Sequence, residues 1–395
     1  MTPKVIIEIT SLVEVSFVSG IQRVVREILT RALTRRSTDV EFVLLRYDVH
    51  HKAFRQITPE DFLAVYRDRT DSHERIRSTP YRMENLGPDD LFLDIDSVWN
   101  NRFRRSFLLP ILKSLGVRIA VMVYDIIPIL FPEYCDGQTT VRFMDYIGAH
   151  LLYADLLLAN TRSTLDDIDR LSDRIGTPRI PGACIPLGAD FTAPRDHPAA
   201  VNLDAKTSAI TQGKFLLCVG TIEPRKNHAF LLDTYIERLR DKGYGLIIAG
   251  RPGWNVENLT ERLTGMNRSD ASFAYLPAAD DSTIAYLYQK AYFTVFPTEY
   301  EGYGLPIIES ILRKTPVLAS DIPVLREVGG TFCAYFATRD KDAFCDRLVQ
   351  YEENPEAYEA LRDHLAEYQP FTWDLSEDLL WETLRKTFFE KENRA

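Results

Sequence analysis

The stretch AYFTVFPTEYEGYGLPIIES, residues 291–310, joins an apolar run to a helical pattern through a short turn that holds two glycines. The apolar run 291–298 is typical of a buried strand. Pro306 suits the first turn of a helix, because the N–H group that proline lacks would have no partner there. Gly302 and Gly304 permit unusual backbone angles and close approach. The stretch therefore predicts a strand, a turn and a helix in succession, which is the repeating unit of an α/β fold.

Two carboxylates flank this turn. Glu301 is expected in the loop and Glu309 about one turn into the helix. Eight residues turn a helix by about 800°, so the two side chains would not share one face. We interpret them as contacts to different parts of one extended ligand, with an anion held between them by turn amides and the helix dipole. The simpler alternative is that Glu301 is a plain loop carboxylate and Glu309 only favours the start of the helix.

A second turn has the same context. VGTIEPRKNHAFLLDTY, residues 219–235, again follows an apolar run and opens a helical pattern. Arg225 and Lys226 are placed to neutralise a diphosphate, and Asn227 is a candidate helix cap. An isolated Arg-Lys pair is commonly just a solvated turn. Two such turns in one half of the chain, one offering amides and one offering cations, favour a nucleotide-sugar ligand.

The alternation of apolar runs and amphipathic stretches extends over the whole chain. The runs are near-continuously hydrophobic, which predicts parallel sheets covered on both faces. Expected strands are residues 4–10, 41–48, 90–96, 118–125, 155–160, 214–220, 245–250, 271–277, 291–298 and 315–321, with helices at 20–33, 228–241 and 281–291.

The chain is long enough for more than one domain. It has 395 residues, and single cores rarely grow to that size. The polar, proline-containing stretch 190–212 is the best linker candidate. We expect a first domain at 1–200 and a second at 208–373, with a terminal helix at about 374–395 packing back on the first. Both would be doubly wound, with ligands beyond the carboxyl ends of the strands, in a central cleft.

Composition narrows the function classes. The formal net charge of −10 argues against a nucleic-acid partner bound over the whole surface. The five cysteines are scattered, form no Cys-x-x-Cys pair, and are expected to be free thiols. We see neither a signal peptide nor an apolar run of about 20 residues that could span a bilayer. These features together predict a cytoplasmic protein.

Two basic stretches are candidates for contact with the inner membrane. One, residues 21–36, carries Arg23, Arg26, Arg31, Arg35 and Arg36. The other, residues 101–113, carries Arg102, Arg104 and Arg105 beside Phe103 and Phe107. Basic amphipathic helices bind anionic lipid. The alternative is that each stretch is a helix with a solvated basic face and an apolar stripe packed on the core. This is the interpretation we favour for both stretches.

These segments together resemble the retaining glycosyltransferases of family 4 (GT4), which have the GT-B fold of two Rossmann-like domains facing a cleft. The likeness covers the C-terminal half almost continuously and is looser in the N-terminal half. The matching segments are VGTIEPRKN, LIIAGRPGW, YLPAADDSTIAYLYQKA, FPTEYEGYGLPIIES and TPVLASDIPVLREVGG, with GIQRVVREIL, VYDIIPILFPEY, ANTRST and IPLGAD before them.

The resemblance implies roles for individual residues. Glu309 would bind the ribose of the nucleotide, and Glu301 would contact the transferred sugar. Arg225 and Lys226 would offset charge on the leaving diphosphate. The remaining implied contacts are the turn residues Gly302, Tyr303, Gly304 and Leu305 at the sugar and diphosphate, Gly20 at the phosphates or acceptor, and Leu276 with Pro277 at the base.

Two departures from the family pattern concern Tyr124 and Thr221. Many relatives have His-Asp where this chain has Tyr124-Asp125, which leaves Asp125 to orient acceptor or sugar. Some relatives have an arginine near Thr221, so here the diphosphate contacts would rest on Arg225 and Lys226. The resemblance still implies that Tyr124 and Thr221 lie among the nucleotide-sugar contacts. The family typically needs no metal or other cofactor, and Asp94-Ile95-Asp96 is only a nominal metal motif. The implied chemistry is front-face transfer, in which the leaving phosphate oxygen takes the acceptor's proton.

The resemblance is closest to bacterial enzymes that build O-antigen, capsule or exopolysaccharide. It implies a saccharide acceptor, with a lipid-linked saccharide as one candidate, and favours GDP-mannose as donor. UDP- and dTDP-sugars remain alternatives, as do a nucleotide-sugar epimerase, a phosphorylase-like enzyme and a non-catalytic glycan-binding protein of the same fold.

Overall fold

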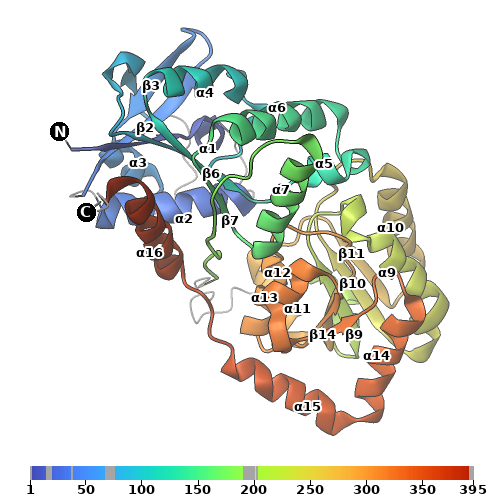
Figure 1. Ribbon diagram of the computed structural model, residues 1–395. Coiled ribbons are helices and arrows are strands. Elements are labelled where there is room, and N and C mark those ends of the chain that lie inside the picture. The colour runs from blue at the N-terminus through green and yellow to red at the C-terminus, as the bar shows by residue number, and fades with distance from the viewer. Residues whose placement is uncertain are drawn as a thin grey trace. The chain divides into compact units, whose positions relative to one another are not determined.

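A computed structural model of the chain describes residues 2–14, 20–36, 39–66, 76–189, 201 and 203–390. The chain forms two compact units, each with its own sheet (Figure 1). Unit 1 is drawn from the segments Met1–Leu130, Gly137–Gly188 and Phe371–Ala395, and unit 2 from Phe131–Asp136 and Ala189–Pro370. Most of the expected linker lies outside the described residues, but its end forms helix α8 (Ala205–Ile210).

Unit 1 is built on an eight-stranded sheet in the order β4-β3-β2-β1-β5-β6-β7-β8. The expected parallel strands are present, and an antiparallel extension of β3 and β4, which the sequence pattern did not reveal, lies at one edge. β3 is short and half-buried, and both residues of β4 are exposed, so neither strand has a continuous apolar run. The strands are β1 (Lys4–Glu8), β2 (Glu41–Asp48), β3 (Ala53–Ile57), β4 (Thr79–Pro80), β5 (Leu91–Asp94), β6 (Arg118–Val123), β7 (Leu156–Ala159) and β8 (Gly182–Cys184).

Helices surround this sheet and bury its apolar side chains. α4 and α6 pack beside one another, and α16 packs on α2 (Figure 1). The helices of unit 1 are α1 (Thr10–Glu14), α2 (Gly20–Arg35), α3 (Pro59–Tyr66), α4 (Arg105–Ser114), α5 (Ile127–Leu130), α6 (Gly137–Tyr153), α7 (Arg162–Ile175) and α16 (Trp373–Leu384). Within the described ranges, no helix combines the length and apolar character needed to cross a bilayer.

Unit 2 has a six-stranded, fully parallel sheet in the order β11-β10-β9-β12-β13-β14. Alternate side chains of each strand enter cores on opposite faces: Leu216 packs toward α9, α10 and α14, and Leu217 toward α11. The strands are β9 (Phe215–Val219), β10 (Gly245–Ala249), β11 (Phe273–Leu276), β12 (Phe293–Phe296), β13 (Val317–Ser320) and β14 (Cys333–Phe336). The helices are α9 (His228–Thr234), α10 (Glu257–Ser269), α11 (Asp281–Lys290), α12 (Leu305–Leu312), α13 (Pro323–Gly329), α14 (Lys341–Glu353) and α15 (Pro355–His364).

The order of strands in unit 2 marks a ligand position. The chain runs from β9 outward to β10 and β11, and then returns to place β12 on the other side of β9. The direction of winding therefore reverses between β9 and β12. In open α/β sheets, the crevice beyond the carboxyl ends of strands at such a reversal is where ligands bind.

Candidate functional site

Two loops meet at this reversal in unit 2. Residues 220–227 follow β9, and residues 297–304 follow β12. Two hydrogen bonds to one carbonyl connect the loops. The backbone oxygen of Arg225 accepts from the amide of Glu299 at 2.8 Å and from Oγ1 of Thr298 at 3.0 Å. The two turns singled out in the sequence are thus neighbours in space.

An ion-pair cluster lies between the loops, with Glu301 buried and its partners partly exposed. Lys226 Nζ is 2.6 Å from Glu301 Oε1, and a guanidinium nitrogen of Arg225 is 2.7 Å from Glu301 Oε2. The other terminal nitrogen of Arg225 is 2.7 Å from the carboxylate of Glu223. Glu301 itself is only 8% exposed. The resemblance implies a part in catalysis for Glu301, Arg225, Lys226 and Asp125. The structure brings the first three together and adds Glu223, which the sequence motif did not single out.

The charges of this cluster determine what Glu301 can do. Burial would raise the pKa of Glu301, but attraction to Arg225 and Lys226, and hydrogen bonds from both, outweigh it and lower the pKa to about 2. Glu301 is therefore a carboxylate at neutral pH. It can accept hydrogen bonds and orient cations, but it has no proton to donate as a general acid.

Two glycines shape the backbone around the cluster. Gly220 has a φ of +145°, and a Cβ built there would approach the Nζ of Lys226 to 3.4 Å. Gly304 has a φ of +99° and immediately precedes α12, with Pro306 in the first turn as expected. Gly302 does not adopt a positive φ. The glycine requirement predicted for the turn is thus located at Gly304.

Asn227 differs from its expected role. It is the residue before α9, but its side chain makes no capping hydrogen bond. Its backbone instead adopts the left-handed conformation, with a φ of +56°, after a 3₁₀ turn over Pro224–Lys226. Asparagine tolerates this conformation better than most residues. Asn227 therefore supports the turn through its backbone and not as a side-chain cap.

Glu309 belongs to a different group of contacts. It lies on α12, where Tyr288 Oη of α11 donates to its Oε2 at 3.3 Å. The guanidinium of Arg313 lies over the Tyr288 ring, 5.2 Å from its centroid, and donates to the backbone oxygen of Glu309 at 3.0 Å. Tyr288 is fully buried. No pattern in the sequence distinguished Tyr288 from an ordinary core residue of an amphipathic helix.

The other predicted donor contacts of unit 2 lie on the same carboxyl edge. Leu276 ends β11, and its backbone oxygen accepts from the amide of Gly250 at 3.0 Å. Thr221 follows Gly220 in the β9 loop and is partly exposed. Tyr303 and Leu305, on either side of Gly304, are also partly exposed.

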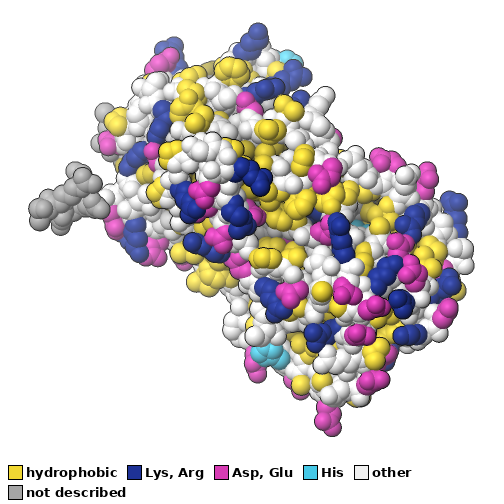
Figure 2. All heavy atoms as spheres, turned by 45° about the vertical axis from the view of Figure 1, so that its right-hand side comes forward, with side chains coloured by type: hydrophobic (Ala, Val, Ile, Leu, Met, Phe, Trp, Pro, Cys, Tyr) yellow, Lys and Arg dark blue, Asp and Glu magenta, His cyan; other side chains and the backbone are white. Residues whose placement is uncertain are grey.

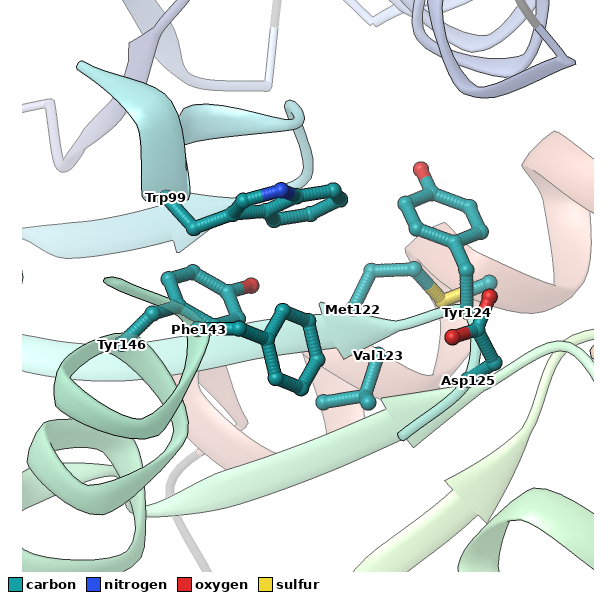
Figure 3. Close-up of a pocket in the computed structure, with 7 residues that line it drawn as sticks. All are labelled: Trp99, Met122, Val123, Tyr124, Asp125, Phe143 and Tyr146. Carbon is teal, nitrogen blue, oxygen red and sulfur yellow. The ribbon is translucent and has the colours of Figure 1, made fainter. Parts of the chain in front are cut away.

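The remaining candidates belong to unit 1. Tyr124 and Asp125 follow β6 and line a small pocket, in which Trp99, Phe143 and Tyr146 lie on one side and Tyr124 and Asp125 on the other (Figure 3). Tyr124 Oη donates to the carbonyl of Ile95 at 2.7 Å, and burial raises the pKa of Tyr124 well above its ordinary value. The hydroxyl of Tyr124 is therefore buried and already donates a hydrogen bond within unit 1. The Asp125 carboxylate accepts from the amide of Ile127 at 3.0 Å.

Gly20 is the first residue of α2 and is exposed. A Cβ built on it would meet nothing within 4 Å. The described part of unit 1 therefore gives no steric reason for a glycine at this position. Residues 15–19, which precede it, lie outside the described residues.

The nominal metal motif lies in a buried charge network of unit 1. Arg105 binds Asp94 at 2.6 Å and Glu8 at 2.7 Å, and His150 Nε2 lies 2.9 Å from the Asp94 carboxylate. All four side chains are almost completely buried. Arg105 is therefore a core ion-pair residue and not one of the surface bases of the stretch 101–113. Asp94 pairs with side chains of the same unit.

The first basic stretch is also largely neutralised. Arg31 pairs with Asp374 at 2.7 Å, and Glu377 accepts from Arg35 at 3.0 Å and from Arg36 at 3.2 Å. Asp374 and Glu377 lie on α16, beside α2. On the face in Figure 2, basic and acidic side chains are interspersed. Three of the five arginines that could bind an anionic membrane, Arg31, Arg35 and Arg36, therefore form ion pairs with α16 instead.

Comparison with known proteins places these features in a family. Residues 202–368 match the family described as glycosyl transferases group 1. The O-antigen chain mannosyltransferase B of Escherichia coli is 31% identical over 268 residues, which are 65% of this chain and 67% of that protein. The serotype-specific mannosyltransferase WbdA of Escherichia coli is 26% identical over 393 residues, which are 98% of this chain and 44% of WbdA. The chain thus spans less than half the length of this relative.

Solved structures agree on the fold. Sucrose-phosphate synthase of Thermosynechococcus elongatus superposes with a TM-score of 0.62 at 14% identity, covering 98% of this chain and 99% of that one. The two Rossmann-like α/β units of this chain therefore match the arrangement found in GT-B glycosyltransferases. The chain belongs to the glycosyl transferases group 1 family, GT4, and has the GT-B fold.

Proposed function

We propose that the chain transfers a hexose, with retention of anomeric configuration, from a nucleotide sugar to a saccharide acceptor during synthesis of a bacterial surface polysaccharide. The observation that carries the proposal is Glu301, a buried carboxylate held between Arg225 and Lys226 where the strand order of unit 2 reverses. A site with two cations around one carboxylate suits a ligand with a sugar at one end and a diphosphate beside it.

The geometry suggests how the charges would work. Arg225 and Lys226 carry two positive charges against the one negative charge of Glu301. A diphosphate entering beside them would compete with Glu301 for the same N–H groups, and it gains negative charge as the glycosidic bond breaks. Preorganised cations stabilise that developing charge without reorganising. Glu301 holds them in place and contacts the transferred sugar.

The two ends of the donor would be held by different elements. Glu309, which Tyr288 orients, would accept hydrogen bonds from the ribose hydroxyls. The turn Gly302 to Leu305 would face the sugar and diphosphate, with Thr221 and Leu276 farther along the same edge. Asp125 of unit 1 would orient the acceptor. The acceptor's proton would pass to the leaving phosphate oxygen, so no metal or cofactor is required by this scheme.

The donor we favour is GDP-mannose. The support is the similarity to the O-antigen mannosyltransferase and to WbdA, both from Escherichia coli. A lipid-linked saccharide is the corresponding acceptor, because O-antigen chains grow on such carriers in the scheme that the resemblance implies.

The test is a transfer assay with GDP-mannose, UDP-, dTDP- and ADP-sugars, using synthetic mannosides as acceptors and EDTA throughout. We expect transfer from GDP-mannose alone, and an α-linked product by NMR from the α-linked donor. Transfer from another nucleotide would change the donor and keep the enzyme class. Binding of a glycan without turnover of any donor would instead support a non-catalytic GT-B protein.

A further inference from the structure

A short segment from the N-terminal half of the sequence is part of unit 2. The chain leaves unit 1 after Leu130, contributes residues Phe131–Asp136 to unit 2, and re-enters unit 1 at Gly137. We call residues 131–136 the strap. Its centre is a 3₁₀ turn over Pro132–Tyr134.

The strap is bound to the loop after β12, directly before Glu301. Tyr134 Oη donates to Glu299 Oε2 at 3.0 Å, and Arg339 Nε donates to Glu299 Oε1 at 2.6 Å. The ring of Phe131 packs on that of Tyr300, with 5.3 Å between centroids. The strap thus contacts the two residues that precede Glu301 in the chain.

The other side of the strap is bound to the loop after β10. Asn255 Nδ2 donates to the carbonyl oxygens of Glu133 and Cys135, each at 3.4 Å. Asn255 has a φ of +55°, in the left-handed region. Cys135 is buried. Asparagine tolerates the left-handed conformation better than most residues, and in it the Asn255 side chain reaches two carbonyls of the strap.

The two attachments bracket the candidate site. β10 and β12 are the strands on either side of β9. A segment bound to both of their loops therefore passes the carboxyl end of β9, where Arg225 and Lys226 lie. The same loop residues also touch Arg225, because its guanidinium donates to the carbonyl of Tyr300 at 3.0 Å and its own carbonyl accepts from the amide of Glu299.

We propose that the strap holds the Glu301 turn in its working position, and that Tyr134 and Phe131 are positioning residues for the donor site. The physical reason is that Tyr134 and Phe131 contact the two residues immediately before Glu301 from outside the turn, in addition to the bonds that Arg225 makes with the same two residues. Tyr134 fixes Glu299, Phe131 fixes Tyr300, and Glu301 follows. The role in turnover rests on the proposed function, whereas the hold on the turn does not.

The first experiment replaces one hydroxyl. Tyr134→Phe removes the bond to Glu299 and keeps the ring. A hydrogen bond to a charged group contributes enough to change a rate by about tenfold when its loss displaces a catalytic group. We expect kcat to fall by about that factor, with the donor KM and the Tm nearly unchanged. Tyr351→Phe is the matched control, because Tyr351 packs on Phe293 at the opposite end of β12.

A double-mutant cycle tests whether Tyr134 affects turnover through its hydrogen bond to Glu299. If Tyr134 acts through Glu299, the combined Tyr134→Phe, Glu299→Gln variant loses no more activity than Glu299→Gln alone. Additive losses would overturn the proposal, as would a fall in kcat that follows the fall in Tm.

A second readout is independent of the enzyme's activity. Hydrogen exchange of the segment 297–304 should become faster in Tyr134→Phe than in wild type, and remain at the wild-type rate in Tyr351→Phe. Unchanged exchange in Tyr134→Phe refutes the strap's hold on the turn. A wild-type protein that turns over no donor, together with faster exchange in Tyr134→Phe, would refute the proposed function and keep the strap.

Discussion

At Glu301, burial and ion pairing act on the same carboxylate in opposite directions, and the ion pairs prevail. A buried charge with one partner removed is strongly destabilised. The cluster is therefore a single unit, in which no member can be replaced without changing the charge that the others experience. Glu309 has no place in it, and the two glutamates of the turn should give different phenotypes.

The first prediction separates these two roles. Lys226→Ala removes a cation that stabilises the leaving diphosphate, so kcat should fall by about 100-fold, with a smaller change in nucleotide affinity. Glu309→Ala should weaken nucleotide binding by about tenfold or more. Steady-state kinetics and calorimetric titration with the nucleoside diphosphate measure the two effects. Lys214→Ala, at an exposed lysine of the same unit, is the control. Identical kinetics in all three variants would refute the site assignment.

His228 gives a prediction for pH. Burial, and then the charge of Lys226, lower the pKa of His228 to about 3, whereas an unfolded histidine titrates near 6.5. Between these values the unfolded chain binds a proton that the folded chain does not, so stability falls as the pH falls below about 6.5. At pH 5 this one group should lower the free energy of unfolding by about 2 kcal/mol.

Replacing His228 by leucine removes the imidazole that binds this proton in the unfolded chain. The stability lost between pH 7 and pH 5 should shrink by about 2 kcal/mol in His228→Leu, as measured by urea unfolding at both values. His364→Leu, at a histidine on α15 that is half-exposed, should leave the loss as it is. The same loss in wild type and His228→Leu would contradict the assignment of this pH dependence.

At the scale of elements, α16 is joined to α2 by a set of ion pairs. Glu377 is 1% exposed and accepts from both Arg35 and Arg36. A nearly buried carboxylate with two guanidinium partners is costly to alter, because its replacement leaves two cations short of an acceptor. The helix is therefore a structural part of unit 1, and the arginines of α2 have a structural role.

Glu377→Gln tests this pairing. We expect the free energy of unfolding of unit 1 to fall by about 2 kcal/mol, with a lower Tm. The matched control is Glu382→Gln on the same helix, since Glu382 is exposed and its ion pair is a local one, with Lys386 four residues later. An isolated surface pair is worth little. Equal Tm values for the two variants would show that α16 is held by its apolar side chains alone.

At the scale of the whole molecule, the charge distribution limits where a membrane can bind. Arg31, Arg35 and Arg36 are engaged by α16, and Arg105 is buried. The remaining candidate is the start of α4, where Phe107 is 65% and Ile111 45% exposed, next to the exposed Arg102 and Arg104. Exposed apolar side chains beside arginines suit an anionic lipid surface.

The sequence alone favoured a solvated face for residues 101–113, but the exposed Phe107 and Ile111 change that interpretation. We expect the protein to co-sediment with vesicles that contain phosphatidylglycerol, and not with phosphatidylcholine vesicles. Phe107→Asp should abolish this binding. Ile175→Asp, at an exposed isoleucine on α7 of the same unit, should leave it intact. Wild-type protein that stays in the supernatant with both kinds of vesicle would mean that the α4 surface has another role.

Much of the architecture could be predicted from the sequence because it depends on local patterns. The apolar run 41–48 is a strand with those same bounds, and the pattern at 281–291 is a helix over Asp281–Lys290. Burial on both sheet faces imposes that hydrophobicity. The antiparallel strands β3 and β4 were missed, because an edge strand that is half-exposed carries no such run.

Burial of charge was harder to predict. Arg105 lies in a basic stretch and looked like a surface residue, yet it pairs with Asp94 and Glu8, the last of which is 97 positions away. The resemblance includes Tyr124 among the nucleotide-sugar contacts, and only the structure shows that its hydroxyl donates to the carbonyl of Ile95. A sequence pattern reports the kind of residue, and partners distant in sequence decide whether its polar atoms remain available.

The sequence by itself determined the fold class, the two glycine-containing turns and the family, because hydrophobic periodicity and turn chemistry are properties of neighbouring residues. Only the tertiary structure decided that Arg225 and Lys226 pair with a buried Glu301, that Tyr288 contacts Glu309, and that residues 131–136 belong to unit 2. The physical reason is that parallel strands place loops from distant parts of the chain at one sheet edge, so contacts there follow from the order of strands and not from distance along the sequence.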